Sequence, residues 1–356
     1  MRDRGAAISP FRFPVDSIMN KNRRDTLSRL AALAALSASV PGLSSAQGAA
    51  VKKLKLVATN SYTQQPIAFG VEKGFFREEG LDVEFVDVQD AVTGVATGEL
   101  SFAFGPTSVY LRAAALGAPI KIVSSGFRSK GPYFLIARPG IQDIAGLKGK
   151  TVGNAHAGSN LDTVLRTILV RNGLDPRRDV TLFGNGSTQQ AYGTLISGQV
   201  DATIIHQPFA ALGELEKTSR TLARGWDYLP TYHTGVLIAG DRLIANDPDL
   251  LRRGLRAYFK SYTYAKANYP EYLPWLQARL KLNPRAIELA LRQEDDVWDN
   301  NPDVDPVAIA DTQRIEIEQQ NQKAPYDAKK HIDLRFVPRE YVKPFQYPDQ
   351  SAPLKG

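Results

Sequence analysis

Short apolar runs alternate with helical segments along the first part of the chain. Residues 51–57 (VKKLKLV) and 81–88 (LDVEFVDV) have the alternating pattern of half-buried strands. Between them, a polar stretch leads into a helix predicted from Ile67 to Glu72. Strand patterns and helical patterns then keep alternating up to about Ala239. This order of elements predicts an α/β fold.

The pattern changes after Gly240, where predicted helices follow one another. The run Asn246-Asp247-Pro248 supplies cap residues and a proline suited to a first helical turn, and Asn283-Pro284 opens a second helix. A third follows Pro306, and the final stretch is rich in proline, which predicts a tail that runs over the surface. The first of these helices has apolar residues at helical spacing that we expect in the core: Leu251, Leu255, Tyr258, Phe259 and Tyr262.

Two segments resemble one another at a separation of 100 residues: GELSFAFGPTS begins at Gly98 and GQVDATIIHQPF begins at Gly198. In each, a glycine and a polar residue precede a strand pattern. The strand then ends in a polar turn that contains a proline, Pro106 or Pro208. The repetition indicates two similar halves, each of which ends a strand in a loop.

Residues 1–46 are predicted to be an N-terminal extension and export signal rather than part of the fold. From Asn22 the chain reads NRRDTLSRLAALAALSASVPGLSSAQ, an arginine pair followed by a mildly apolar run and small residues. The pair Arg23-Arg24 resembles a twin-arginine export signal, with a Sec signal as the alternative. The apolar run is too short to span a bilayer as a stable helix. Met19 lies just ahead of the basic stretch and is an alternative start.

Charge and composition narrow the classes of function. The 356 residues have a formal charge of +7, but residues 1–46 carry seven Lys or Arg against three Asp or Glu, which leaves +3 for the rest. The remaining charges are interspersed, so the basic block of a DNA or RNA binder is missing. The absence of cysteine excludes disulfides, Cys-ligated zinc and thiol nucleophiles.

Motifs for catalysis or metal binding are not found in the sequence. There is no GxSxG, Walker A or GxGxxG motif. The histidines have no metal-ligand spacing such as HExxH: His156, His206, His233 and His331. We therefore predict neither an enzyme, a metal site nor a cofactor.

The segment from Thr151 (TVGNAHAGSNLDTVLRTILVRNGL) predicts a strand that leads into a well-defined helix start. Ser159 with Asp162 three positions later fits a capping box. A helix N-terminus has backbone N–H groups without intrahelical partners, so it can bind an anion. Gly158 would let a ligand approach the backbone there. The alternative is an ordinary capped helix in which Asp162 occupies the free donors.

Three other loops have a similar polar character. Residues 60–65 (NSYTQQ) follow the first strand, while 105–108 (GPTS) and 206–209 (HQPF) end the two repeated segments. Ligands collect beyond the carboxyl ends of strands in an open α/β sheet, which is where all four loops fall. His156 and His206 could each donate to a ligand or pair with an anion, or be ordinary packing residues.

Taken in order, these pieces resemble the periplasmic binding proteins of nitrate, sulfonate and taurine ABC importers, a group that also includes binding proteins for thiamine precursors. The matching pieces are GVEKGFFREEGLDVEFV, ATGELSFAFGPTS, IQDIAGLKGKTVG with HAGSN, and LISGQVDATIIHQPF. They cover roughly residues 52–240.

The resemblance implies a type II periplasmic binding fold, in which two α/β lobes are joined by a two-crossing hinge. The first lobe would be 47–137 and 240–356, completed by the C-terminal helices, and the second 138–239, with crossings near 137–140 and 236–240. A small anion would lie in the cleft, and closure around it would be recognised by an inner-membrane permease with its ATPase. The protein would act as a periplasmic monomer. The expected ligand contacts are Ser61, Tyr62, Gln64, Gln65, Thr107, Ser108, His156, Gly158, Ser159, Asn160, His206 and Gln207.

Departures from the family pattern keep other functions open. Ser101 stands where the family often has an acidic residue, although its counterpart Asp201 fits. The four loops are poor in Lys and Arg, which fits an anion held by neutral donors but also a polar uncharged or aromatic ligand. A pyrimidine-synthase-like enzyme is disfavoured because the cysteine-rich stretch of those enzymes is absent from this sequence. A transcriptional regulator is disfavoured because it would need a helix-turn-helix in the segment where the export signal lies.

Overall fold

The computed structural model describes residues 51–58, 61–128 and 130–347. The predicted export signal, residues 1–46, lies outside these residues. Within the described part of the chain, no helix is both long and apolar enough to cross a membrane.

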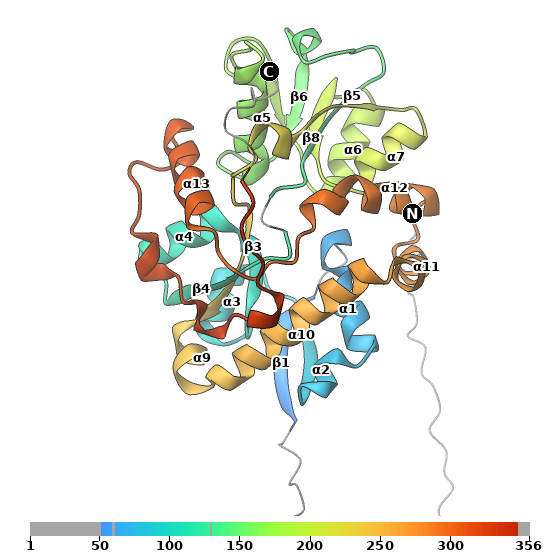
Figure 1. Ribbon diagram of the computed structural model, residues 1–356. Coiled ribbons are helices and arrows are strands. Elements are labelled where there is room, and N and C mark those ends of the chain that lie inside the picture. Colours follow the sequence, from blue (N-terminus) through green and yellow to red (C-terminus); the bar gives the residue numbers. More distant parts are fainter. Residues whose placement is uncertain (1–50, 59–60, 129, 348–356) are drawn as a thin grey trace, which may run out of the picture. The chain divides into compact units, whose positions relative to one another are not determined.

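The first lobe contains two groups of strands (Figure 1). Strands β1 (Lys52–Val57) and β2 (Leu81–Val86) pair in parallel. Strands β3 (Ala103–Pro106), β10 (Gly235–Gly240) and β4 (Ile120–Ser125) form an antiparallel sheet in that order. Backbone bonding between Ser101 and Lys55 joins the two groups.

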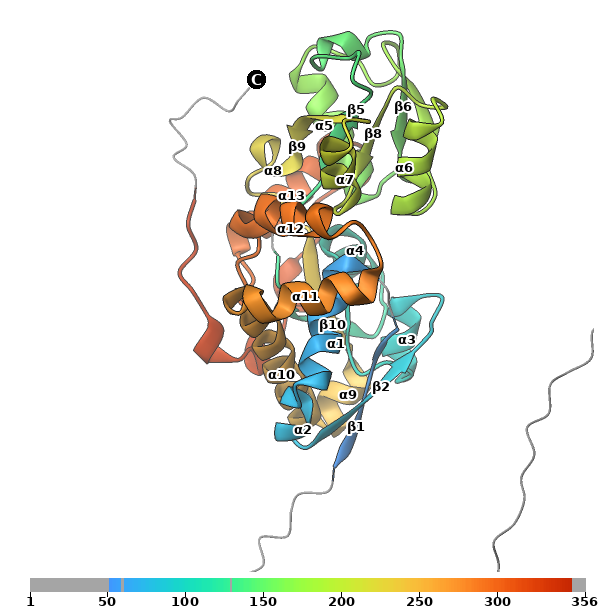
Figure 2. The same ribbon diagram turned by 90° about the vertical axis from the view of Figure 1, so that its right-hand side faces the viewer.

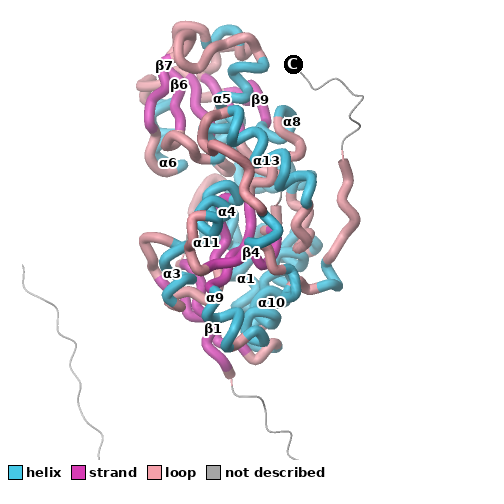
Figure 3. The backbone as a smooth tube through the Cα atoms, turned by 90° about the vertical axis from the view of Figure 1, so that its left-hand side faces the viewer, coloured by secondary structure: helices cyan, strands magenta, loops and turns pink. Residues whose placement is uncertain are grey.

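The second lobe is built on one five-stranded sheet, whose strands form a separate group in Figure 3. Its order is β7-β6-β8-β5-β9. The two β6 pairings are parallel and the two β5 pairings are antiparallel. The strands span β5 (Phe134–Ala137), β6 (Thr151–Asn154), β7 (Thr181–Gly184), β8 (Ala202–Ile205) and β9 (Arg220–Arg224).

The two lobes repeat one arrangement, as the sequence predicts. Strands β2, β1, β3, β10 and β4 correspond in order and direction to β7, β6, β8, β5 and β9. Ser101 Oγ accepts a hydrogen bond from the backbone N–H of Lys55 at 3.0 Å, and Asp201 Oδ2 accepts one from that of Thr151 at 3.0 Å. Ser101 therefore departs from the acidic pattern in charge but keeps the same acceptor role.

The chain crosses between the lobes earlier than the sequence predicts. Strand β5 ends the segment 47–137 that is predicted for the first lobe, but it belongs to the five-stranded sheet of the second lobe. Strand β10 belongs wholly to the first lobe. The crossings are therefore 126–133 and 229–234, and the boundaries expected at 137/138 and 239/240 are wrong by several residues. Both strands are apolar and buried along their whole length, so their pattern does not say which sheet they join.

The helices start where the sequence provides caps. Asp247 accepts a hydrogen bond from Leu250 N in front of α10 (Pro248–Ala267), and Asn283 caps α12 (Pro284–Glu294). The five residues predicted for the core of α10 are fully buried. The other helices of the first lobe are α1 (Gln65–Glu72), α2 (Phe75–Glu78), α3 (Ala91–Thr97), α4 (Thr107–Ala115), α9 (Asp241–Asn246) and α11 (Tyr269–Leu280). Those of the second are α5 (Asn160–Arg171), α6 (Thr188–Ile196), α7 (Phe209–Leu215) and α8 (Gly225–Tyr228).

The last two long helices contact both lobes instead of only completing the first. Helix α12 packs against α11 and against α7 of the second lobe (Figure 2). Helix α13 (Pro306–Glu318) packs on α4, yet its Ile315 lies in the core of the second lobe. Glu316 Oε1 accepts hydrogen bonds from Thr163 and Tyr232 at 3.1 and 2.6 Å. The C-terminal helices therefore link the lobes.

Candidate ligand-binding cleft

A cavity of about 290 Å³ lies between the lobes, beyond the carboxyl ends of the strands. All four loops predicted from the sequence contribute to its wall, and so do both crossings. The predicted residues that line it are His156, Ser159, Asn160 and His206. Residues that the sequence analysis did not single out include Thr63, Phe104, Phe127, Arg128, Tyr133 and Thr234.

The start of α5 forms one side of the cavity. Ser159 Oγ accepts a hydrogen bond from Asp162 N at 3.3 Å, so Ser159 caps the helix, but the predicted capping box is only half present, because Ser159 N donates to the His156 carbonyl and not to Asp162. The Asp162 carboxylate accepts from Gly158 N, one residue before the N-cap, at 2.9 Å and from Arg166 Nε at 2.7 Å, so it does not occupy the free donors of the first turn as the alternative interpretation requires. With Asp162 N bonded to Ser159, the first-turn N–H groups left without an intrahelical acceptor are those of Asn160 and Leu161, and both residues line the cavity.

The side chain of Asn160 is used to hold the lobes together. Its Oδ1 accepts from Ser108 of the first lobe at 3.3 Å and from Tyr232 at 3.1 Å. Its Nδ2 donates to the Thr234 carbonyl at 2.9 Å and to the Tyr133 hydroxyl at 3.2 Å. Asn160 therefore borders the cavity while its amide group serves the interface between the lobes.

Two of the predicted contacts lie behind the cavity wall. Thr107 and Ser108 are buried, and neither belongs to the lining. Thr107 Oγ1 instead lies 2.9 Å from Nδ1 of the buried His233, in the second crossing. Gly158 does not line the cavity, and its φ of +74° fits a turn that favours glycine.

A second, more polar cavity of about 640 Å³ adjoins the first, since Thr63 and His206 line both. The predicted residues Ser61, Tyr62, Gln65 and Gln207 line this outer cavity with Arg279 and Lys281, whereas Gln64 lines neither. Two of these amides already have protein partners. Gln65 Oε1 accepts from Arg279 Nε at 2.7 Å, and Gln207 bonds Gln293 of α12 at 2.6 Å.

His206 is a neutral polar group at the junction of the two cavities. Burial, with the nearby Arg128 cation as a smaller cause, lowers the pKa of His206 to about 4. Its Nδ1 is buried and makes no hydrogen bond within the described residues. The ring meets Tyr133 edge to face, with centroids 5.0 Å apart. Near pH 7 the imidazole can therefore offer a ligand one donor or acceptor but no charge.

Arg128 is the cationic residue that the sequence analysis missed. It lies in the first crossing, lines the 290 Å³ cavity and is only 4% exposed. Its guanidinium lies 4.5 Å from the centroid of the Phe127 ring. Nη1 is 2.7 Å from Glu294 Oε2, but within the described residues it makes no hydrogen bond. The four loops are poor in Lys and Arg, and this cation comes instead from the first crossing, which lies outside them.

Glu294, at the end of α12, is the counter-charge. It is 2% exposed, and burial raises the pKa of its carboxyl group to about 7, although Arg128 acts in the opposite direction. One oxygen, Oε1, makes no hydrogen bond within the described part of the chain. Because Arg128 Nη1 and Glu294 Oε1 have no hydrogen-bond partner within the described residues, Arg128 keeps an N–H group that can interact with a further anion.

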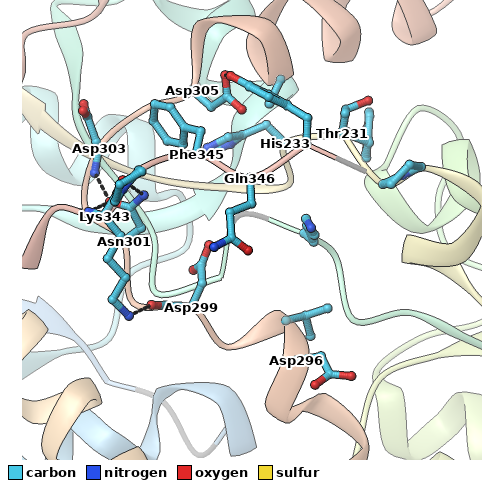
Figure 4. A pocket seen from close by; sticks show the side chains of 17 residues that line it. Thr231, His233, Asp296, Asp299, Asn301, Asp303, Asp305, Lys343, Phe345 and Gln346 are labelled. Carbon is cyan, nitrogen blue, oxygen red and sulfur yellow. Dashed lines mark hydrogen bonds between the residues drawn. The ribbon is translucent and has the colours of Figure 1, made fainter. Parts of the chain in front are cut away.

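A third cavity, of about 420 Å³, has none of the predicted loop residues in its wall. Figure 4 shows the side chains that line it. It is bounded by both crossings and by residues 343–347. Its wall has more carboxylates than cations, which disfavours an anion there: Asp296, Asp299, Asp303 and Asp305 against Lys130 and Lys343. Within the described residues, no group of three or more His, Asp or Glu is arranged to hold a metal ion.

The family described as NMT1/THI5 like matches residues 61–271, more than half of the chain. This range contains all the predicted contact residues and both crossings.

Two relatives are binding proteins by name. One, from Bacillus subtilis (strain 168), is provisionally named an aliphatic sulfonates-binding protein and is 24% identical over 65% of this chain and 71% of its own. The other is the formylaminopyrimidine-binding protein of Halalkalibacterium halodurans, 28% identical over 57% of this chain and 62% of its own.

Solved structures share the fold at low identity. The periplasmic aliphatic sulphonate binding protein SsuA of Escherichia coli superimposes with a TM-score of 0.63 and 16% identity, over 84% of this chain and 97% of its own. The desulfurization enzyme DSZB superimposes with a TM-score of 0.59 and 17% identity, over 80% and 97%. The two-lobe periplasmic binding fold is thus confirmed, and it is a fold that carries both binding proteins and an enzyme.

Proposed function

We propose, from the premise that this chain belongs to the NMT1/THI5 like family, that it is the solute-binding component of an ABC importer and captures a small organic anion in the 290 Å³ cavity. The names of its relatives support a binding role. The chain has no cysteine, so the thiol chemistry of a pyrimidine synthase is not available to it.

One observation carries the choice of an anion, namely the buried Arg128 on the cavity wall. A guanidinium removed from water needs hydrogen-bond acceptors for its N–H groups, and Glu294 supplies the one carboxylate contact found in the described residues. A sulfonate or carboxylate oxygen in the cavity would supply more. The N-terminus of α5, on the same wall, favours the same sign of charge.

The arrangement of the lobes suits capture by closure. The cavity is lined from both lobes and both crossings, so a ligand there would contact every part that moves in a hinge rotation. Ligand contacts in both lobes favour the closed state, and a permease can recognise that shape. We accordingly propose an exported, periplasmic monomer that delivers its ligand to an inner-membrane permease and ATPase.

A second candidate ligand is a neutral pyrimidine. The observation in its favour is the neutral His206, since an uncharged imidazole with a buried, unbonded Nδ1 can pair with a heterocycle. The Halalkalibacterium halodurans relative is named for such a ligand.

A thermal-shift panel on purified, ligand-stripped protein tests the proposed function. Ethanesulfonate, benzenesulfonate, benzoate, nitrate and formylaminopyrimidine would be added separately. A ligand at a hundred times its dissociation constant stabilises the folded state by about 2.7 kcal/mol, which raises Tm by several degrees. We expect at least one organic anion to do so. A shift with the pyrimidine alone, or with none of the compounds, would contradict the proposal.

A further inference from the structure

Aromatic rings make up much of the wall of the 290 Å³ cavity. Phe104, Phe127, Tyr133 and His206 line it, and Pro106 and Pro132 add flat apolar surface. The rings offer a surface that matches a planar, apolar body.

The rings are arranged as two pairs that come from different elements. Phe104 on β3 and Phe127 in the first crossing have centroids 5.7 Å apart, with planes tilted by 46°. Tyr133 and His206 are 5.0 Å apart at 64°. Aromatic rings prefer offset or edge-to-face contacts with centroids about 4.5–7 Å apart, so a further ring between such pairs can satisfy the same preference.

Glycines provide the space in which two of these rings lie. A Cβ atom on Gly126 would lie 2.2 Å from the Phe104 ring, and one on Gly235 would lie 2.6 Å from it. A Cβ atom on Gly131 would lie 2.1 Å from the Tyr133 ring. Two of these glycines are in the first crossing, so the segment that carries Arg128 also fits closely around the aromatic wall.

The position of Arg128 fits a ligand with an anionic group on a ring. Its guanidinium lies against Phe127, so the charge adjoins the aromatic wall directly. An anionic substituent can meet the N–H groups of Arg128 while the ring to which it is attached meets the side chains beside it. Polar substituents can extend past His206 into the outer cavity, which shares that residue.

We propose that the ligand is an arene that carries a sulfonate or carboxylate group, with Phe104 as a residue that determines specificity for the ring. The proposal rests on the proposed function, because it names the class of anion that the same cavity takes. Its distinct content is a preference for a flat aromatic body over an aliphatic body of similar size.

Isothermal titration with matched compounds tests this preference. Benzenesulfonate and cyclohexanesulfonate have the same anionic group and similar size, but only the first is aromatic. An aromatic pair is worth about 0.5–1.5 kcal/mol beyond the buried area, which is a factor of about 2–12 in the dissociation constant. We expect benzenesulfonate to bind several-fold more tightly, and benzamide, which has the ring without the charge, not to bind measurably. Benzoate then distinguishes the two anionic groups.

A pair of variants links the preference to the wall. Phe104→Leu keeps an apolar side chain and should reduce the benzenesulfonate to cyclohexanesulfonate ratio towards one. Phe85→Leu is the matched control, because Phe85 is 43% exposed on β2 and outside the cavity lining, and it should leave the ratio unchanged.

The outcomes separate the two proposals. If cyclohexanesulfonate or ethanesulfonate binds as tightly as benzenesulfonate in the wild-type protein, the preference for an arene is overturned while the anion site stands. The same conclusion follows if Phe104→Leu leaves the ratio unchanged. If no sulfonate or carboxylate binds, the proposed function itself fails. Binding of benzamide as tight as that of benzoate would overturn the role of the charge.

Discussion

At the scale of single residues, Arg128 and Glu294 decide the charge of the cleft. Each is at least 95% buried and each is the other's only ionic partner within the described residues. Replacing one member alone would leave an uncompensated buried charge and confound binding with folding. The pair is therefore best tested together.

The double variant Arg128→Met/Glu294→Gln should fold and lose the ability to bind anions. Neither replacement is charged and both are close in size to the original side chains, so the loss of stability should stay within a few kcal/mol. Removing a charged hydrogen-bonding partner of a buried anion should weaken the affinity for organic anions by roughly a hundredfold. Calorimetric titration against the wild-type protein checks the affinity, and circular dichroism checks the fold. Wild-type affinity in a folded double variant would show that Arg128 is not the anchor.

The raised pKa of Glu294 predicts that the unfolding free energy of the wild-type protein, relative to that of Glu294→Gln, changes with pH. Its pKa of about 7 in the folded state exceeds the value of about 4.5 expected unfolded, so the folded state holds a proton that the unfolded state loses in this range. The unfolding free energy of the wild type, minus that of Glu294→Gln, should therefore fall by on the order of 2–3 kcal/mol as the pH rises from 4.5 to above 7.

The difference between wild type and Glu294→Gln is compared because two histidines also change the stability of each protein in this pH range. Their effect on the unfolding free energy has the opposite sign. Burial lowers the pKa values of His206 and His233 to about 4, so both cost stability as the pH falls below about 6.5. They contribute equally to wild type and variant and cancel. Urea titrations at several pH values measure the difference, and a difference that does not change with pH would show that Glu294 titrates normally.

Part of the wall of the candidate cavity follows from the sequence at residue scale. His156, Ser159, Asn160 and His206 were predicted because polar residues at strand ends identify ligand loops, and they line the cavity. Arg128 follows strand β4 within the first crossing and lies outside the four predicted loops. Arg128 is buried because it packs on Phe127 and pairs with Glu294. Neither residue belongs to the four loops, so the sequences of the loops do not reveal this packing.

At the scale of elements, the first crossing shapes the cavity as much as the predicted loops do. Its length and start could not be predicted, because β5 and β10 are both fully buried and their patterns are alike. Helix starts were predictable, since caps such as Asp247 and Ser159 are local signals.

Gly126→Ala should disturb the crossing and the cavity together. The new methyl group would overlap the Phe104 ring and force it to move, which should cost about 1–3 kcal/mol and weaken the binding of benzenesulfonate. Gly140→Ala is the control, since its methyl group would meet no atom within 4 Å. Thermal unfolding and titration of both variants compare the effects. Unchanged affinity in a destabilised Gly126→Ala would mean that the position of Phe104 is not important for binding.

At the scale of the whole molecule, side-chain contacts between the lobes bear on closure. Ser108 and Asn160 were predicted to touch the ligand, and in the structure they bond to each other across the lobes. Helices α12 and α13 add further contacts between the lobes, through Gln293 to Gln207 and through Glu316 to Thr163. The two-lobe fold followed from the resemblance, whereas these links depend on tertiary packing that one sequence does not reveal.

Ser108→Ala should weaken ligand binding without changing the cavity wall. One hydrogen bond is worth about 0.5–1.5 kcal/mol, so the dissociation constant should rise about two- to twelvefold if the bond stabilises the closed state. Ser197→Ala, which removes a bond within the second lobe, is the control. Small-angle scattering should show the same decrease in radius of gyration at saturating benzenesulfonate in all three proteins. Unaltered affinity in Ser108→Ala would show that the hydrogen bond between Ser108 and Asn160 does not stabilise the closed state.

The most direct test of the central claim is a crystal structure of the protein grown with benzenesulfonate, and a second grown with ethanesulfonate. The account predicts electron density for the sulfonate in the cavity between the lobes, with an oxygen within hydrogen-bond distance of the Arg128 guanidinium. A sulfonate bound in the acidic cavity beside Asp303, or in the cleft without contact to Arg128, would contradict it.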